Sequence, residues 1–379
     1  MSATAFQIAN KIRQQPLGGA SIQDFQLSEP KQVSSGILLN SPYISLYSLD
    51  FEMQRAVFVE TPEAVKLSEA SFYWMAQYEQ AIRVMTLSFA DFIVLANQIS
   101  IEPCNLNFIY STGRAGSTLA SQIFSCVDSL DAISEPDALT LMVAARHAAR
   151  AKNQDSEHIL KPLLAASVRF LCKSRTATHF VIKGRSQTAE IGDWLHELFP
   201  QAKTFFLYRN AESWLVSAKR AFTDDQIREP AAQIALEKAT RAYLAPVTEL
   251  VATYPENQHL SFVELLVLTW LSAMNACLRM QHMGVEMLPI SFLSWRSQPE
   301  ETARKMLAYC DCEPSSSDRL LDVLSCDSQA DTVLGRKRIQ QSEQRRSQSL
   351  LPDDVEKLNY HLHRHDTIRS ADFIIPGTL

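Results

Sequence analysis

The 379-residue chain lacks the markers of several protein classes. Its seven cysteines are few and scattered, which argues against a disulfide framework, and the odd number leaves at least one thiol unpaired. Positive charge is in deficit, because 36 Lys and Arg stand against 42 Asp and Glu for a net charge of −6. The negative net charge argues against a general nucleic-acid binder. The scattered cysteines make a reducing compartment the simpler expectation.

Long hydrophobic runs are also missing from the sequence. Residues 1–19 lack the apolar core of roughly 7–15 residues that a signal peptide needs. The most apolar helical stretch, Leu265–Leu278, has 14 residues without a charge, which is typical of a buried core helix rather than a membrane span. We therefore expect a cytoplasmic protein without a membrane span.

A glycine turn stands between a predicted strand and a predicted helix. The apolar run Phe108–Tyr110 leads into STGRAGST, and a helical pattern starts near Ser117. Free backbone N–H groups and the helix dipole favour an anion at such a helix start, so phosphate is the first ligand to consider. The candidate contacts are Gly113, Arg114, Ala115, Gly116, Ser117 and Thr118. The turn is not a Walker A loop, since Gly116 stands where that loop has Lys. The alternative is that the glycines serve only tight packing.

Charged residues follow three successive predicted strands. Glu135 comes directly after Ala132–Ser134, Lys183 ends the next strand, and Arg209 ends the buried run KTFFLYR. The carboxyl ends of parallel strands face the ligand crevice of an α/β sheet, so these charges are predicted near the glycine turn. The alternative for Glu135 is a carboxylate that stabilises the helix starting at Pro136.

The chain is predicted to have two parts. Residues 1–103 would form an N-terminal cap or subdomain, and residues 104–379 an α/β domain with a parallel sheet flanked by helices. Within the first part, a strand is predicted at Ala56–Glu60 and a long helix from Pro62 to Gln98. The aromatic residues of that helical pattern are typical of a core face.

Two features near the C-terminus have alternative interpretations. The basic segment around Arg336 and Lys337 is either a solvated face or a loop that folds over a bound phosphate. His361, His363 and His365 alternate along a predicted helix, which would turn the middle one away from the others, so no metal site is expected.

Two of these segments resemble the sulfotransferases that use 3′-phosphoadenosine-5′-phosphosulfate (PAPS). STGRAGSTLAS is similar to the family's loop for the 5′-phosphosulfate, with Arg114 where many members have Lys. FPQAKTFFLYRNAESWLVSAKRAF resembles the 3′-phosphate element, in which Arg209 ends a strand and Ser217 follows eight positions later. The resemblance covers about residues 105 to 312 and implies the sulfotransferase fold, which is related to that of P-loop nucleoside triphosphate hydrolases.

The resemblance also implies roles for single residues. Glu135 is similar to the catalytic glutamate of the tyrosylprotein branch, where it serves as general base, and Lys183 to the lysine at the end of its third strand. Arg114, Lys183 and the loop would hold the 5′-phosphosulfate, and Arg209 and Ser217 the 3′-phosphate. Arg336 and Lys337 would match a C-terminal basic loop. The implied reaction transfers a sulfuryl group from PAPS to a hydroxyl or amine of a small-molecule or peptide acceptor, without a metal, and leaves 3′-phosphoadenosine-5′-phosphate (PAP).

Other functions stay open at this point. Other branches of the family use a histidine base, for which His147, His179 and His196 are available, although His196 lies mid-helix and His179 begins a strand. A small-molecule P-loop kinase is disfavoured, because the Walker lysine and a strand-end Asp for Mg²⁺ are both missing. A non-catalytic nucleotide-binding scaffold is the alternative outside the enzymes.

Overall fold

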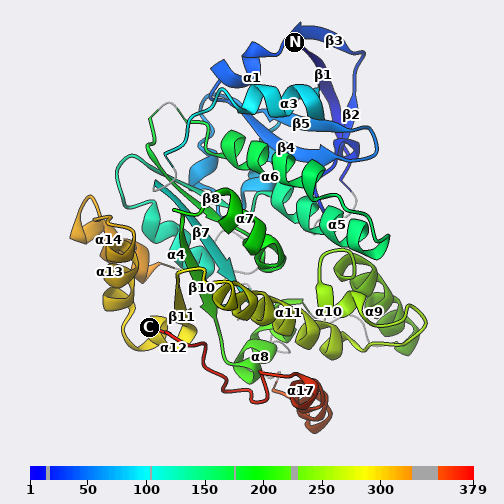
Figure 1. The fold of residues 1–379 in the computed structure, drawn as a ribbon, viewed down its shortest axis with the longest axis vertical. Helices are drawn as coiled ribbons and strands as arrows, with labels where there is room; N and C mark the ends of the chain where they lie inside the picture. The colour runs from blue at the N-terminus through cyan, green and yellow to red at the C-terminus, as the bar shows by residue number, and fades with distance from the viewer. Residues whose placement is uncertain (14–17, 103–104, 175, 223–228, 327–348) are drawn as a thin grey trace. The chain divides into compact units, whose positions relative to one another are not determined.

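The computed structural model describes residues 1–13, 18–102, 105–174, 176–222, 229–326 and 349–379 (Figure 1). Its strands form two sheets. One is antiparallel in the order β2-β1-β6-β5-β4, with β3 also paired to β1. The other is parallel in the order β11-β10-β7-β9-β8.

The antiparallel sheet is built from the first ninety residues. Its strands are β1 (Ser2–Lys11), β2 (Phe25–Leu27), β3 (Lys31–Ser34), β4 (Ile44–Asp50), β5 (Arg55–Glu60) and β6 (Arg83–Ser88). Successive side chains of a strand point to opposite faces of its sheet, and those of β5 pack on both faces. Val57 and Val59 pack in a cluster with Tyr47, whereas the ring of Phe58 lies 5.8 Å from that of Phe92 and 5.1 Å from that of Phe170. Both faces of the sheet are therefore covered.

The predicted strand at residues 56–60 is confirmed, but the predicted long helix over residues 62–98 is wrong. That stretch contains η2 (Leu67–Glu69), α2 (Tyr73–Gln80), β6 and α3 (Phe89–Ala96). Strand β6 pairs with β1 on one side and β5 on the other. Pairing on both sides satisfies its backbone groups, and this tertiary contribution outweighs a local helical pattern. Ser88 then starts α3, since its hydroxyl accepts a hydrogen bond from the Asp91 amide.

The parallel sheet confirms the predicted α/β class. Its strands are β7 (Leu106–Ser111), β8 (Leu130–Ser134), β9 (His179–Lys183), β10 (Lys203–Tyr208) and β11 (Met287–Ser291). All six residues of β7 are buried, as expected for a strand that is covered on both faces. At the carboxyl ends of the strands, the last paired residues are Ser134 with Lys183 in β8–β9, and Tyr208 with Ser291 in β10–β11.

Helices flank this sheet and fill the rest of the chain. They are η1 (Ile22–Asp24), α1 (Gly36–Asn40), α4 (Ser117–Phe124), α5 (Asp137–Ala151), α6 (Glu157–Leu171), η4 (Ser186–Ile191), α7 (Gly192–Leu198), α8 (Ala211–Phe222), α9 (Pro230–Leu244), α10 (Glu249–Ala252), α11 (Phe262–His282), α12 (Phe292–Ser297), α13 (Pro299–Tyr309), α14 (Ser317–Ser325) and α17 (Pro352–Arg364). Among the described residues, α11 is long and apolar enough to cross a membrane, but 78% of its apolar window is buried inside the protein. This burial agrees with the predicted core helix.

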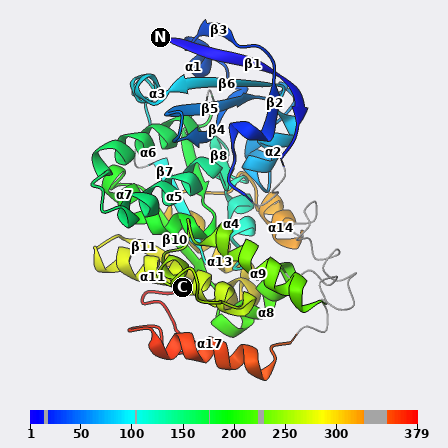
Figure 2. The same ribbon diagram turned by 90° about the vertical axis from the view of Figure 1, so that its right-hand side faces the viewer.

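Contacts divide the chain into two compact units. The first unit contains residues 1–108, 128–184 and 194–202, and the second contains residues 109–127, 185–193 and 203–379. In the first unit, α3 packs against α6 (Figure 1). In the second unit, α11 contacts α8, α9, α10 and α17. Figure 2 shows α8, α9, α11 and α17 from another side.

Candidate functional site

The glycine turn joins β7 to α4 in the second unit, and its backbone has an unusual conformation. Gly113 (φ +72°), Arg114 (φ +52°) and Gly116 (φ +86°) all lie in the left-handed region. Turns that include such residues can direct successive N–H groups to one side and form a concave anion site. Gly116 is the N-cap of α4, and no side chain caps that helix start. The amides of the first turn therefore suit an anion, as predicted.

The carbonyl groups of this turn are held by α8. Trp214 Nε1 donates to the carbonyl oxygens of Thr112 (3.0 Å) and Gly113 (2.9 Å). The Thr112 amide donates to the Leu207 carbonyl (3.0 Å), which ties the turn to β10. The Gly113 amide donates to the Ser111 hydroxyl (3.2 Å), so it stabilises the turn rather than presenting a donor to a ligand. The rest of the predicted anion site begins at Arg114.

Arg114 links the turn to α8 through a side-chain contact. Its Nε donates to the Ser217 hydroxyl at 3.2 Å, although the two residues are 103 positions apart in the chain. Asn210 caps α8, since its Oδ1 accepts from the Ser213 amide (3.1 Å). The structure thus brings together two residues that the sequence assigned to different phosphates.

Arg209 follows β10 and is held from three directions. Its Nε donates to the Ser213 hydroxyl (2.9 Å), and its carbonyl accepts from Trp270 Nε1 (3.0 Å). Its guanidinium carbon lies 4.4 Å from the centroid of the Phe292 ring, a cation–π contact. The side chain is therefore preorganised at the carboxyl end of its strand.

Four guanidinium groups gather around this position, and we call Arg114, Arg209, Arg220 and Arg296 the arginine cluster. Burial, and then the positive charges of Arg114, Arg296 and Arg220, lower the pKa of Arg209 to about 10. Like charges in a partly desolvated place repel one another, and a polyanion would remove that repulsion. The cluster therefore favours a ligand with more than one negative charge.

Arg220 and Arg296 are members of the cluster that were not predicted from the sequence. Arg220 lies three residues after Ser217 on α8, so the helical period places both on one face, a signal that was available. Arg296 belongs to α12, which follows the last strand. No local pattern relates Arg296 to Arg209, because only tertiary packing brings them close.

Glu135 and Lys183 form an ion pair at the strand ends of the first unit. Lys183 Nζ donates to Glu135 Oε1, and the Glu135 amide donates to the Lys183 carbonyl (2.6 Å). The Lys183 side chain is 2% exposed and that of Glu135 is 19% exposed. Glu135 has φ +59°, a left-handed value that is strained for a residue with a side chain. The register of β8 and β9 places the two groups together.

Residues of the N-terminal sheet region hold this pair in place. The Ser134 hydroxyl, next to Glu135 in the chain, donates to the Ser71 carbonyl (2.8 Å). The lysine ammonium of the pair lies 5.9 Å from the centroid of the Phe72 ring. Asp137 forms an ion pair with Arg13 at 3.6 Å, and both side chains are almost fully buried. Nothing in the sequence predicted these contacts.

The three histidines considered as alternative bases lie within helices or at the start of a strand. His179 is the first residue of β9, His147 lies within α5 and His196 within α7. None of the three stands at the carboxyl end of a strand, where Glu135 and Lys183 are found. Arg336 and Lys337 lie outside the described residues. Within the described ranges, no group of three or more His, Cys, Asp or Glu side chains could hold a metal ion.

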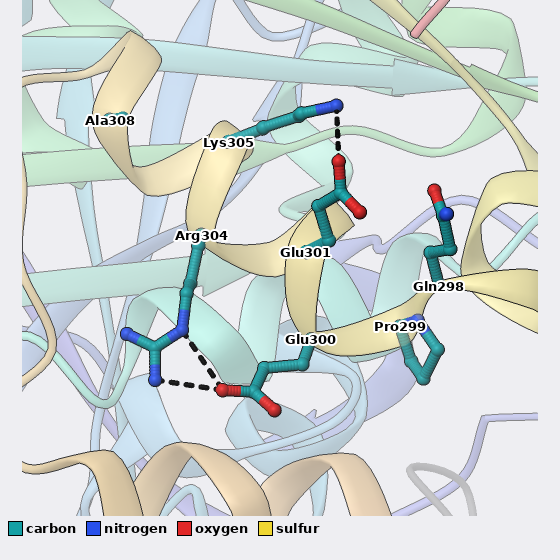
Figure 3. Close-up of a pocket in the computed structure, with 7 residues that line it drawn as sticks. All are labelled: Gln298, Pro299, Glu300, Glu301, Arg304, Lys305 and Ala308. Carbon is teal, nitrogen blue, oxygen red and sulfur yellow. Dashed lines mark hydrogen bonds and ion pairs between the residues drawn. The ribbon is translucent and has the colours of Figure 1, made fainter.

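A surface hollow of about 750 Å³ lies along α13 (Figure 3). Glu300 pairs with Arg304 and Glu301 pairs with Lys305, each four residues apart. Such pairs are ordinary features of an exposed helix face. The charges of the hollow are thus used within the helix, and none of the predicted site residues line it.

No protein-family model and no curated protein matches the chain. Solved structures do match it. A sulfotransferase from Alicyclobacillus acidocaldarius is 14% identical over 69% of this chain and 96% of its own, with a TM-score of 0.38. A sulfotransferase domain from the curacin biosynthetic pathway is 14% identical over 70% of this chain and 99% of its own, also at 0.38. Retinol dehydratase, solved with androsterone and the inactive cofactor PAP, is 11% identical over 64% and 71%, at 0.29. Likenesses this distant assign no activity, so the function is argued from the chain's own residues.

Proposed function

We propose that the protein is a PAPS-dependent sulfotransferase that acts on a hydroxyl or amine of a small-molecule or peptide acceptor. The observation that carries the proposal is the arginine cluster beside the glycine turn, joined by the contact between Arg114 and Ser217. A nucleotide with phosphates at both its 3′ and 5′ positions supplies two anionic groups. The chain offers two kinds of hydrogen-bond donor to them, the backbone amides of the turn and the side chains of the arginines and Ser217.

The residues divide between the two ends of the donor. The backbone amides at the start of α4, with Arg114, would hold the 5′-phosphosulfate. Arg209 and Ser217 would hold the 3′-phosphate through charge-assisted hydrogen bonds, and Arg220 adds a further charge. Arg336 and Lys337 remain candidates for the same phosphates. In this assignment the 3′-phosphate distinguishes the donor from ATP.

Glu135 is proposed as the general base of the transfer. The acceptor oxygen or nitrogen forms a bond to sulfur while the bond between sulfur and the phosphate oxygen breaks, and PAP leaves with the electron pair. The acceptor proton passes to Glu135. The amides of the turn and Arg114 stabilise the charge that builds on the leaving oxygen. Lys183 would add to that stabilisation once the acceptor enters, while its ion pair keeps Glu135 oriented.

The contact between Lys183 and Glu135 gives the lysine two proposed tasks. In the structure its ammonium binds the carboxylate. An ammonium has three N–H donors, so one can stay on Glu135 while another reaches a phosphosulfate oxygen. Lys183 would then couple the base to the donor.

Calorimetry with PAP and with ATP plus Mg²⁺ tests the donor assignment. We expect binding of PAP and no comparable binding of ATP; the reverse order would indicate a small-molecule kinase. A transfer assay with labelled PAPS and a broad acceptor panel then separates an enzyme from a nucleotide-binding scaffold, which would bind PAP without turnover.

A further inference from the structure

Trp295 has a buried hydrogen-bond donor without an acceptor. The side chain belongs to α12 and is 5% exposed. Within the described part of the chain, its Nε1 has no hydrogen-bond partner. Leaving a buried N–H unsatisfied costs stability, and buried indole N–H groups usually find an acceptor. A group kept in this state calls for an explanation, and a ligand is one.

The indole lies directly against the end of the glycine turn. A Cβ atom added to Gly116 would stand 3.2 Å from Trp295 Cδ1 and 3.4 Å from Trp295 Nε1. The pyrrole part of the indole, which carries the N–H, therefore lies next to the N-cap residue of α4. Two features favour glycine at position 116: its φ is +86°, and an added Cβ would make an unusually close contact with the ring.

Short helix α12 supplies other residues to the same place. Phe292 lies under the guanidinium of Arg209, and Arg296 is a member of the arginine cluster. Trp295 thus sits between two residues that already contact the proposed anion site or contribute charge to it. Its own contribution is a donor without charge, which adds direction to the site without adding to the repulsion among the arginines.

We propose that Trp295 Nε1–H donates a hydrogen bond to an oxygen of the anion bound at the start of α4. This inference rests on the proposed function for the identity of that anion, the 5′-phosphate of PAP or PAPS. An indole N–H can only donate, so it favours an ionised phosphate oxygen at that position. Trp295 is then a binding residue at the 5′ end of the nucleotide, distinct from Arg209 and Ser217 at the 3′ end.

Isothermal titration of the full chain with PAP tests the inference through the variant Trp295→Phe, which removes the N–H and keeps an aromatic ring. We expect PAP affinity to fall on the order of tenfold, which corresponds to about 1.4 kcal/mol. Trp194→Phe is the control, because Trp194 is similarly buried and is not among the residues proposed to bind the nucleotide. That variant should bind PAP as the wild type does. Unchanged PAP affinity in Trp295→Phe would overturn the inference.

Nucleotides with one phosphate locate the contact. Trp295→Phe should weaken adenosine 5′-monophosphate binding as much as PAP binding and leave adenosine 3′-monophosphate unaffected. An equal loss for the 3′ nucleotide would place the indole at the other end and overturn the assignment.

Indole proton resonances of the wild-type protein give a second measurement if the variant does not fold. One of the five tryptophan N–H signals should move downfield with PAP and with the 5′ nucleotide, but not with the 3′ nucleotide. Absence of such a shift would contradict the proposal. Failure of the wild type to bind PAP would refute the proposed function; titration with inorganic phosphate would then test Trp295 alone, and equal binding by wild type and Trp295→Phe would overturn its role.

Discussion

The arginine cluster and the Glu135–Lys183 pair are both built at strand ends, but they treat charge in opposite ways. In the pair, a carboxylate and an ammonium bind each other directly. In the cluster, the charged groups that act on the pKa of Arg209 are cations. The pair is thus electrically satisfied in the folded chain, whereas the cations of the cluster repel one another. Under the proposed function, this difference separates the residue proposed as the base from the residues proposed to bind the nucleotide.

Glu135→Gln is the largest expected change and tests the catalytic side of the comparison. The amide cannot take the acceptor's proton, so turnover of labelled PAPS should fall about 10² to 10⁴-fold. PAP affinity by calorimetry should stay within about threefold of wild type. Normal turnover, or a large loss of PAP binding, would contradict the role of Glu135 as the base.

Arg209→Met tests whether the cluster binds the nucleotide. Loss of a guanidinium that makes charge-assisted hydrogen bonds should weaken PAP binding about 100-fold. The ligand-free variant should unfold at the wild-type temperature or above it, because a repelled charge is removed. The lowered pKa of Arg209 agrees with this expectation, because it means that the charged side chain destabilises the fold. The repulsion is present while Arg209 is protonated, below pH 10, and is relieved as pH rises through and beyond about 10. A ligand-free variant that unfolds well below wild type would show that Arg209 is a structural residue.

Lys183→Met removes the ammonium that binds the Glu135 carboxylate. Removal of one member of a buried ion pair costs about 3 kcal/mol, which chemical denaturation can measure. The double variant Glu135→Gln with Lys183→Met should recover much of that loss, since both charges of the pair are then removed. Additive effects in this cycle would contradict a direct interaction between the two groups.

Gly116→Ala asks how much of the glycine turn is set by Trp295. The left-handed φ alone costs roughly 1–2 kcal/mol for alanine, and the contact with the indole adds to it. Gly284→Ala is a matched control, with φ +82° and no atom within 4 Å of the added methyl group. Thermal unfolding should therefore show the larger loss for Gly116→Ala, and only that variant should bind PAP less well. Equal losses would mean that the ring does not restrict the turn.

Glu264 lies outside both the arginine cluster and the Glu135–Lys183 pair, and its expected effect on acid unfolding is smaller. His361 at 3.6 Å and the Ser261 hydroxyl and amide lower the pKa of Glu264 to about 2. A carboxyl group with a lowered pKa stabilises the fold above its ordinary value near 4.5, and that stability is lost as pH falls toward 2. Glu264→Gln should lower stability by about 1 kcal/mol at pH 7 and flatten its pH dependence between 5 and 2. An unchanged acid profile would point to other carboxylates.

Sequence reasoning was accurate where one short segment carries its own signal. The strand, the turn and the helix start from Phe108 to Ser117 have a local cause, as do the charges that follow β8, β9 and β10. It failed over residues 62–98, where the predicted helix ran on through Arg83–Ser88, which form strand β6. The pairing of β6 with β1 and β5 decides that stretch, and residues far away in the chain supply it.

By itself, the sequence determined the α/β class, the glycine turn before a helix start and the strand ends at residues 134, 183 and 208, since backbone preference and periodicity act over a few residues. Tertiary structure alone decided the strand order, the contact of Arg114 with Ser217, the approach of Arg296 to Arg209 and that of Trp295 to the turn. Those contacts join residues from about 90 to 180 positions apart, and no local rule relates side chains over such separations.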